Sequence, residues 1–184
     1  CDRPNHPTLH AGSTFMLWGG VTGNPKWFAK GIDYFVDALG NSRPDGSNQF
    51  DVSYRKGRRS LRKQNQIVGY LVMIAEIAAL HGHDLYSLKV GDVSVWTTFE
   101  FLIAGIEDDA VIGRHTGEKV HGHDFLHNDK GSDETVAWFE LLRSRFPNDQ
   151  RVQRFEQISK ANRPWSSPAY GGNLTCFTGK LIRN

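Results

Sequence analysis

The sequence predicts an all-α protein made of antiparallel helical hairpins. Apolar residues recur at helical spacing in several segments, and residues that favour helix N-caps stand before them. No convincing run of alternating strands occurs before about the last dozen residues. The chain has 184 residues, of which 39% are hydrophobic and 23% are charged, so it is long enough to bury one substantial core. We therefore expect residues 1–184 to form a single helical domain.

The first helix that the residue pattern predicts lies in TGNPKWFAKGIDYFVDAL. Asn24 is a typical N-cap, and Pro25 suits the first helical position because that amide would be unpaired in any case. Apolar side chains follow at approximately helical spacing, at Trp27, Ile32, Phe35, Val36 and Leu39. A loop, GNSRPDGSNQ, is expected next, with the turn-forming Pro-Asp-Gly near its centre.

A long helix is expected from about Arg58 to Leu80, ending at His81-Gly82 with a glycine in the usual capping place. Its second half, VGYLVMIAEIAAL, is apolar on nearly every face, so other helices should surround it. No apolar run in the chain approaches the roughly 20 residues that span a bilayer, and we expect no membrane segment.

The second half of the chain predicts three further helices. Asp92 is expected to cap a helix over VSVWTTFEFLIAGI, where the Val, Thr and Phe content makes a buried strand the competing interpretation. A Gly- and His-rich loop is expected from about 107 to 132. Two amphipathic helices follow: DETVAWFELLRSRF, stopped by Pro147, and DQRVQRFEQISK, capped by Asn148.

A basic cluster stands directly at the start of the expected long helix, in RKGRRSLRK. It contains no acidic residue, and its cations are Arg55, Lys56, Arg58, Arg59, Arg62 and Lys63. Like charges on one face near a helix N-terminus cost roughly 1 kcal/mol or more, which an anionic partner would offset. Both a polyuronate and a nucleic-acid backbone carry regularly spaced negative charges that could bind this row of cations. Alternatively, the cluster is an ordinary solvated helix start that binds no partner.

The histidines of HTGEKVHGHDFLH offer a rival site, with candidate ligands at His115, His121, His123, Asp124 and His127. A His-x-His pair with a later histidine is a plausible zinc arrangement, but it is not a specific zinc signature. We therefore expect a polar surface loop that holds no metal. Catalysis by a serine triad is excluded, because no Gly-x-Ser-x-Gly motif occurs.

Three stretches occur in order along the chain: PNHPTLHAGSTFMLWGGVTGNPKWFAKGIDYF, then DGSNQFDVSYRKGRRSLRKQNQIVGYLVMIAEIAALHGHDLY, then AWFELLRSRFP with YGGNLT. Together they resemble the alginate lyases of polysaccharide lyase family 5, which act on poly-mannuronate. The resemblance implies a helix, a short turn and a second helix in the first stretch. It also implies that the chain corresponds to the second half of an (α/α) toroid.

The resemblance implies a set of site residues as well. Asn5 and His6 fall on the family's catalytic Asn-His pair, and Pro4 stands where the family has a further Asn. The family's catalytic Tyr falls on Lys63, so Tyr54 is the other candidate proton donor. The family's catalytic Arg falls near Arg55 or Lys56, and the remaining candidates for substrate binding are Arg58, Arg59 and Arg62.

These residue types suit β-elimination from a 4-linked uronate. The reaction removes the C5 proton beside the carboxylate, and the intermediate resembles an enolate, so donors aimed at the carboxylate lower the barrier most. An Asn-His pair and an Arg can supply such donors, while His, Tyr or Lys can transfer the proton. The geometry must then place Asn5 and His6 across a cleft from the cations Arg55, Lys56, Arg59 and Lys63.

The resemblance also implies an acidic, alginate-like polysaccharide as partner, with neither nucleic acid nor membrane, and no obligatory cofactor. A secreted or periplasmic location follows from such a substrate. Cys1 and Cys176 could pair in an oxidising compartment, although two free thiols are equally compatible. The alternative function is a non-catalytic, polyanion-binding module, because Lys63 replaces the expected Tyr.

Overall fold

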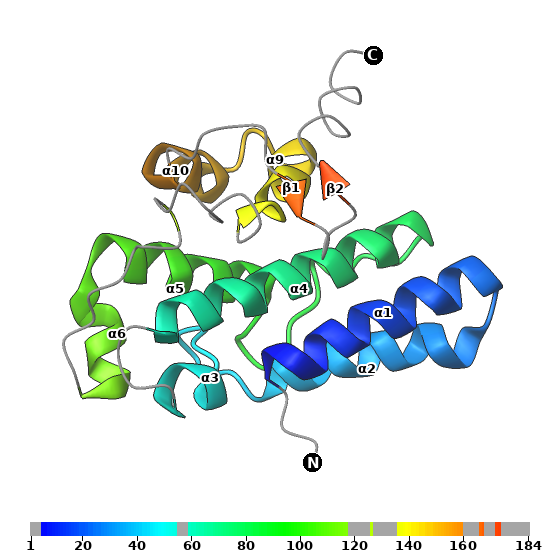
Figure 1. Cartoon of the computed structure of the whole chain (residues 1–184), viewed down its shortest axis with the longest axis horizontal. Coiled ribbons are helices and arrows are strands. Elements are labelled where there is room, and N and C mark those ends of the chain that lie inside the picture. The colour runs from blue at the N-terminus through cyan, green and yellow to red at the C-terminus, as the bar shows by residue number, and fades with distance from the viewer. Residues whose placement is uncertain are drawn as a thin grey trace.

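A computed structural model describes residues 5–54, 59–117, 126, 136–159, 166–167 and 172–173. Its helices are α1 (His6–Thr22), α2 (Pro25–Gly40), α3 (Gln49–Tyr54), α4 (Ser60–Leu80), α5 (Val95–Glu107), α6 (Asp109–Thr116), α9 (Phe139–Arg145) and α10 (Gln150–Ser159) (Figure 1). Two strands, β1 (Ser166–Ser167) and β2 (Gly172–Asn173), form one short antiparallel pair. The predicted all-α class is confirmed.

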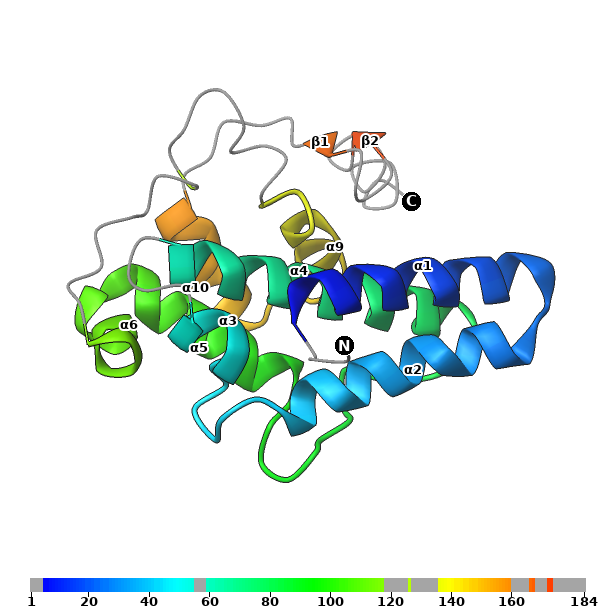
Figure 2. The ribbon, with the colours of Figure 1, turned by 60° about the horizontal axis from the view of Figure 1, so that its bottom comes forward.

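Helices α1 and α2 form an antiparallel hairpin (Figure 2). The N-cap predicted for α2 is confirmed, because Asn24 Oδ1 accepts hydrogen bonds from the amides of Lys26 and Trp27 at 3.1 and 3.3 Å. At the turn, a Cβ on Gly19 would lie 2.3 Å from the backbone nitrogen of Phe28. Glycine at that position therefore lets the two helices approach closely.

Helix α4 lies between this hairpin on one side and α9 and α10 on the other (Figure 1). It runs parallel to α1: His6 contacts Lys63 near the start of both helices, and Gly20 packs against His81 at their ends. Most side chains of its apolar half are buried, as predicted, at Val68, Leu71, Val72, Ile74, Ala75, Ile77 and Ala78, whereas Leu80 at the end of the helix is exposed. The parallel register brings the N-termini of α1 and α4 together.

An aromatic cluster packs between α4, α5 and the last two helices, and its fully buried members are Phe99, Trp138, Phe139 and Phe155. Trp138 Nε1 donates a hydrogen bond to Asn65 Oδ1 of α4 at 3.2 Å, which satisfies two buried polar groups. This cluster fixes α4 on the side opposite the hairpin.

Four predicted helix starts and loops need correction. The long helix begins at Ser60 rather than Arg58, where the buried Ser60 hydroxyl donates to the Val52 carbonyl at 2.8 Å. Helix α5 is capped by Ser94 rather than Asp92, because Ser94 and Thr97 form a reciprocal capping box. Helix α10 follows Asp149, whose carboxylate accepts the Arg151 amide at 2.8 Å, so Asn148 is not its cap.

The fourth correction concerns the expected 107–132 loop, which contains helix α6. Asp108 caps this helix through the Ala110 amide, and Gly117 ends it with a φ of 69°. Helix α3 was likewise not predicted, because six residues are too few for a periodic pattern. Helix α9 does end before Pro147, as predicted, but it begins at Phe139 because Ala137 and Trp138 form a turn.

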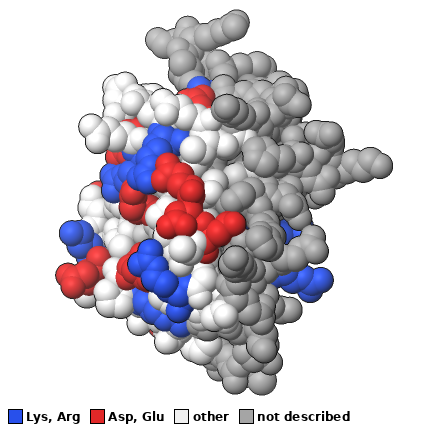
Figure 3. Space-filling model, turned by 90° about the vertical axis from the view of Figure 1, so that its left-hand side faces the viewer, with Lys and Arg blue, Asp and Glu red and all other residues white. Residues whose placement is uncertain are grey.

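The side of the molecule where α5, α6 and α10 lie carries charges of both signs next to one another (Figure 3). Arg154 of α10 donates to Glu100 at 2.6 Å and also pairs with Glu107. The described part of this face therefore carries no field of a single sign. Within the described residues, no helix is both long and apolar enough to cross a membrane.

The loop before α3 generates a prediction about stability. Gly46 has a φ of 89°, and a Cβ there would lie 2.2 Å from the Thr97 carbonyl oxygen, so Gly46→Ala combines backbone strain with a collision. We expect Gly46→Ala to lower the free energy of unfolding in urea by about 3 kcal/mol or more. Gly91→Ala is the matched control, because Gly91 has a φ of 60° with open space around it, and it should cost only about 1 kcal/mol.

Candidate active site

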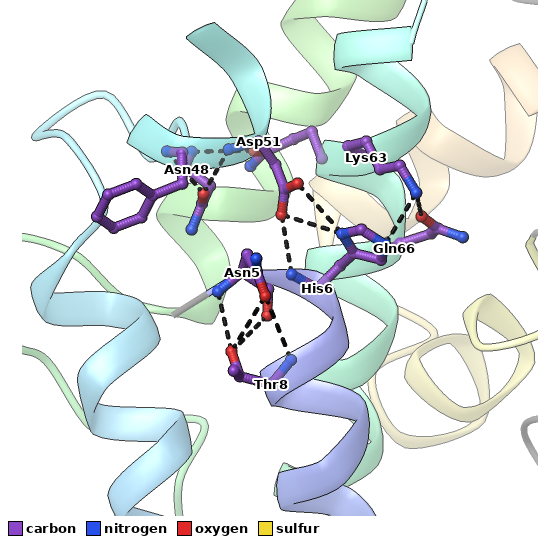
Figure 4. A network of polar contacts seen from close by, with 9 residues as sticks. Asn5, His6, Thr8, Asn48, Asp51, Lys63 and Gln66 are labelled. Atoms are coloured by element: carbon purple, nitrogen blue, oxygen red, sulfur yellow. Dashed lines mark hydrogen bonds and ion pairs between the residues drawn. The ribbon is translucent and has the colours of Figure 1, made fainter. Parts of the chain in front are cut away.

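His6 opens α1, and its imidazole lies between α3 and α4 (Figure 4). Its Nδ1 lies 3.1 and 3.2 Å from the two carboxylate oxygens of Asp51, and its Nε2 lies 2.9 Å from Lys63 Nζ. The His6 side chain is only 16% exposed. The structure thus places His6 against the start of the long helix, where the sequence led us to expect it.

Asp51 holds both the ring and the backbone of His6. Its carboxylate accepts the His6 backbone N–H at 2.8 Å, which is one of the amides that a helix N-terminus leaves unpaired. Burial alone would raise the pKa of the Asp51 carboxyl, but the hydrogen bonds from His6 and the charges of His6 and Lys63 outweigh burial and lower it. Asp51 therefore remains an anion, which is also favourable beside the N-terminus of α1.

Lys63 stands on the first turn of α4 and faces His6 (Figure 4). Its Nζ also donates to Gln66 Oε1, one turn further on, at 2.8 Å. When the ring is neutral and Nδ1 carries the hydrogen, Nδ1 donates to the Asp51 carboxylate, which only accepts, and Nε2 accepts from Lys63. A carboxylate, an imidazole and an amine thus form one hydrogen-bonded row that can relocate a proton.

Asn5 is the N-cap of α1, in a capping box with Thr8. Its Oδ1 accepts the Thr8 amide at 3.4 Å, and Thr8 Oγ1 accepts the Asn5 amide at 2.9 Å. The Nδ2 group of Asn5 donates to no other residue that the structure describes. The Asn5 Oδ1 atom thus caps the helix, while the Nδ2 group can donate the hydrogen bonds that a substrate carboxylate accepts.

The predicted basic cluster is only partly described. Arg59 directly precedes α4, Arg62 lies in its first turn, and both side chains are exposed. Arg55, Lys56 and Arg58 lie outside the described residues. Tyr54 ends α3, but its side chain is outside the described part. Of the expected residues, the structure therefore brings together Asn5, His6 and Lys63.

A buried polar network supports the site from behind. Asn48 Oδ1 accepts the Asp51 amide at 3.0 Å, and Gln64 Oε1 accepts the Asn48 amide at 3.1 Å. Gln64 Nε2 donates to the carbonyls of Gly46 and Thr98 at 2.9 and 3.2 Å. Gln64 follows Lys63 directly, so one network holds the helix that carries Asp51 and the helix that carries Lys63.

The rival histidine site is not assembled in the described part of the chain. His115 Nε2 lies 2.7 Å from Asp45 Oδ2, while His121, His123, Asp124 and His127 fall outside the described residues. Among the residues that are described, no three His, Cys, Asp or Glu side chains are grouped to hold a metal ion.

A hollow of about 440 Å³ lies between the α1–α2 turn and the loop after α4, at the opposite end of these helices from His6. It is lined by glycines, apolar side chains and the histidines His81 and His83. His81 Nδ1 lies 2.9 Å from the Ile77 carbonyl oxygen, a contact that ends α4. The described residues that line this hollow include neither an acid nor a lysine that could form such a row.

The sequence model of the alginate lyase family matches residues 1–112, which is more than half of the chain. The chain belongs to the alginate lyase family. A polysaccharide lyase of Stenotrophomonas maltophilia (strain K279a) is 28% identical to this alginate lyase family member over 157 residues, which cover 85% of the chain and 40% of that protein. The chain therefore spans less than half the length of this relative.

Solved structures agree on the fold. Alginate lyase A1-III from Sphingomonas species A1 aligns with a TM-score of 0.76 at 24% identity, covering 93% of this chain and 45% of that one. A substituted form of alginate lyase A1-III complexed with a tetrasaccharide aligns with a TM-score of 0.78. The helices of this alginate lyase family member therefore form part of an (α/α) toroid, as predicted.

Sequence reasoning missed Asp51 and Gln66. Asp51 lies 45 residues from His6, in a helix too short to predict, so no spacing connects the two. Gln66 is three residues after Lys63 and could have been recognised as its neighbour on one helix face.

The lowered pKa of Asp51 generates a prediction about pH and stability. Because the carboxyl has its ordinary pKa near 3.8 once unfolded, the ionised form stabilises the fold above that pH. Asp51→Asn should lower the free energy of unfolding by about 1–3 kcal/mol at pH 7. The deficit should shrink as the pH falls through the lowered pKa, which urea unfolding at several pH values would reveal.

Asp33→Asn on the exposed surface of α2 is the control, and it should change stability little at any pH. A deficit for Asp51→Asn that stays constant down to pH 2 would contradict the role given to the ionised carboxylate.

Proposed function

We propose that this chain acts as a polysaccharide lyase that cleaves an acidic uronate polymer, such as the poly-mannuronate of alginate, by β-elimination. The observation that carries the proposal is the contact of 2.9 Å between His6 Nε2 and Lys63 Nζ, with Asp51 behind the imidazole. Membership of the alginate lyase family supports the reaction class.

In the proposed reaction Lys63, in its amine form, removes the C5 proton of the uronate. The electron pair of that bond forms the C4=C5 double bond as the bond between C4 and O4 breaks. The Lys63 ammonium then returns the proton to O4 of the departing chain, so the step balances without oxidant or cofactor. Lys63 thus takes the acid and base role for which the family uses Tyr.

The negative charge that develops on the substrate carboxylate must be stabilised by hydrogen-bond donors. Asn5 Nδ2 suits this role, since its partner atom Oδ1 is fixed by the cap of α1. Arg55 or Lys56 would supply the cation that the family resemblance places beside the carboxylate. The exposed Arg59 and Arg62 extend the positive region at the start of α4, where a polymer with one carboxylate per sugar can bind.

A location outside the cytoplasm, secreted or periplasmic, is part of the proposal because alginate-like polymers are extracellular. Cys1 and Cys176 lie outside the described residues, and mass analysis with and without reductant would determine whether they pair. A disulfide would support export, because such bonds persist in oxidising compartments.

Substitution of the proton-transfer pair tests the enzymatic function. We expect His6→Ala and Lys63→Met each to lower the rate of unsaturated product formation from poly-mannuronate by roughly 10²–10⁴-fold, because each removes one end of the proton-transfer contact. The C4=C5 product absorbs in the ultraviolet, which allows continuous measurement. Lys63→Tyr restores the group that the family resemblance places there and should retain activity.

His115→Ala is the matched control, because His115 also pairs with an aspartate but lies outside the site. Its activity should equal that of the unsubstituted chain. Absence of product from the folded, unsubstituted chain would refute the lyase proposal for this polymer.

A second candidate function, non-catalytic binding of a polyanion, is favoured by the exposed Arg59 and Arg62 and by Lys63 at the family's Tyr position. In either function, the double substitution of Arg59 and Arg62 by Ala should weaken poly-mannuronate binding several-fold at low salt and less at high salt. Calorimetric titration at two salt concentrations measures both effects. Arg154→Ala, which removes a cation paired with Glu100 and Glu107 on another face, should leave binding unchanged.

A further inference from the structure

We propose that Asp51 is the positioning residue of the site, which holds His6 in its Nδ1–H form so that Nε2 can take a proton from Lys63. The inference rests on the proposed function, in which Lys63 acts as an amine. It concerns how that amine is formed, and it can be tested without turnover.

The geometry around Asp51 supports this role. Both carboxylate oxygens lie within 3.2 Å of His6 Nδ1, and one of them also accepts the His6 backbone N–H at 2.8 Å. The ring is therefore held at two points of the same residue, which fixes the direction in which Nε2 points. Only 6% of the Asp51 side chain is exposed, so water competes little for these contacts.

The consequence for Lys63 follows from proton balance. An ammonium at Lys63 donates to the lone pair of His6 Nε2, and transfer of that proton gives an imidazolium and a neutral amine. The imidazolium is stabilised by the Asp51 carboxylate, which is in direct contact with its other nitrogen. The net charge of the three groups does not change in this transfer, and the resulting amine can remove the C5 proton.

Gln66 and Asn48 keep the row in place. Gln66 Oε1 accepts from Lys63 Nζ at 2.8 Å and so orients the amine, while Asn48 anchors the Asp51 backbone. The other titratable groups nearby on the packed elements are His10 on α1, Tyr70 on α4 and the exposed Arg59 and Arg62 at the start of α4. Asp51 is the acidic group of α3 that contacts the row.

The direct test is the tautomer of neutral His6, measured by ¹⁵N NMR of the full chain and assigned by comparison with His6→Ala. We expect the unsubstituted chain to carry the hydrogen on Nδ1. In Asp51→Asn, the amide can donate to Nδ1, and the hydrogen should move to Nε2. An Nε2–H tautomer in the unsubstituted chain, or an Nδ1–H tautomer that persists in Asp51→Asn, would overturn the proposal.

Asp45→Asn is the matched control, because Asp45 holds His115 in a comparable pair at 2.7 Å. It should change the His115 signals and leave His6 unaltered. Backbone amide spectra establish that each variant is folded. If Asp51→Asn does not fold, the tautomer in the unsubstituted chain and in Asp51→Glu, which should keep Nδ1–H, still decides the proposal.

Kinetics then separate positioning from a merely structural role. Asp51→Asn should lower kcat between roughly 10-fold and 10⁴-fold, as when the partner that orients a catalytic histidine is removed. The acid limb of its kcat profile should also move to lower pH, because the His6–Lys63 pair loses a neighbouring negative charge. A lower kcat with an unmoved acid limb would contradict the positioning role of Asp51. Absence of product from the unsubstituted chain would refute the lyase function, and the NMR test would still decide the role of Asp51.

Discussion

The arrangement of the site depends on the buried side-chain amide of Gln64. This amide is fully inaccessible, and it is satisfied by the backbone of two other segments: it accepts from Asn48 and donates to Gly46 in the loop before α3, and it donates to Thr98 in α5. A buried amide without partners is costly, so the loop before α3 must dock against α4 and α5 in this one way. That docking places Asp51 opposite His6, and the hydrogen-bonded row of Asp51, His6 and Lys63 follows from it.

The cap of α1 and the candidate active site share the same atoms in this protein. The first amides of α1 have no partner within the helix. The Asn5 side chain and the Asp51 carboxylate accept hydrogen bonds from them. Because Asp51 is attracted to this helix end, the carboxylate is held where it also contacts the His6 ring. The parallel packing of α1 and α4 then brings Lys63 to the other side of the ring, so helix geometry positions all three groups.

The distribution of charge separates the site from the rest of the surface. On the side of α5, α6 and α10, the guanidinium of Arg154 is neutralised by Glu100 and Glu107, whereas Arg59 and Arg62 are exposed beside the proton-transfer row. The proposed binding site for a polyanion therefore lies at the start of α4 rather than on the mixed face. The hollow near His81 and His83 has no comparable combination of charge and proton-transfer groups.

The sequence by itself determined the helical class, the Asn24 cap, the burial of α4, the end of α9 before Pro147 and the family resemblance that pointed to Asn5, His6 and Lys63. These features rest on local chemistry or on motifs that lie in order along the chain. Only the tertiary structure decided that Ser94 and Asp149 cap their helices, that α3 and α6 exist, and that Asp51 meets His6. Asp51 and His6 are 45 residues apart, and their contact depends on the docking of a six-residue helix by Gln64, which no periodicity or spacing in the chain encodes.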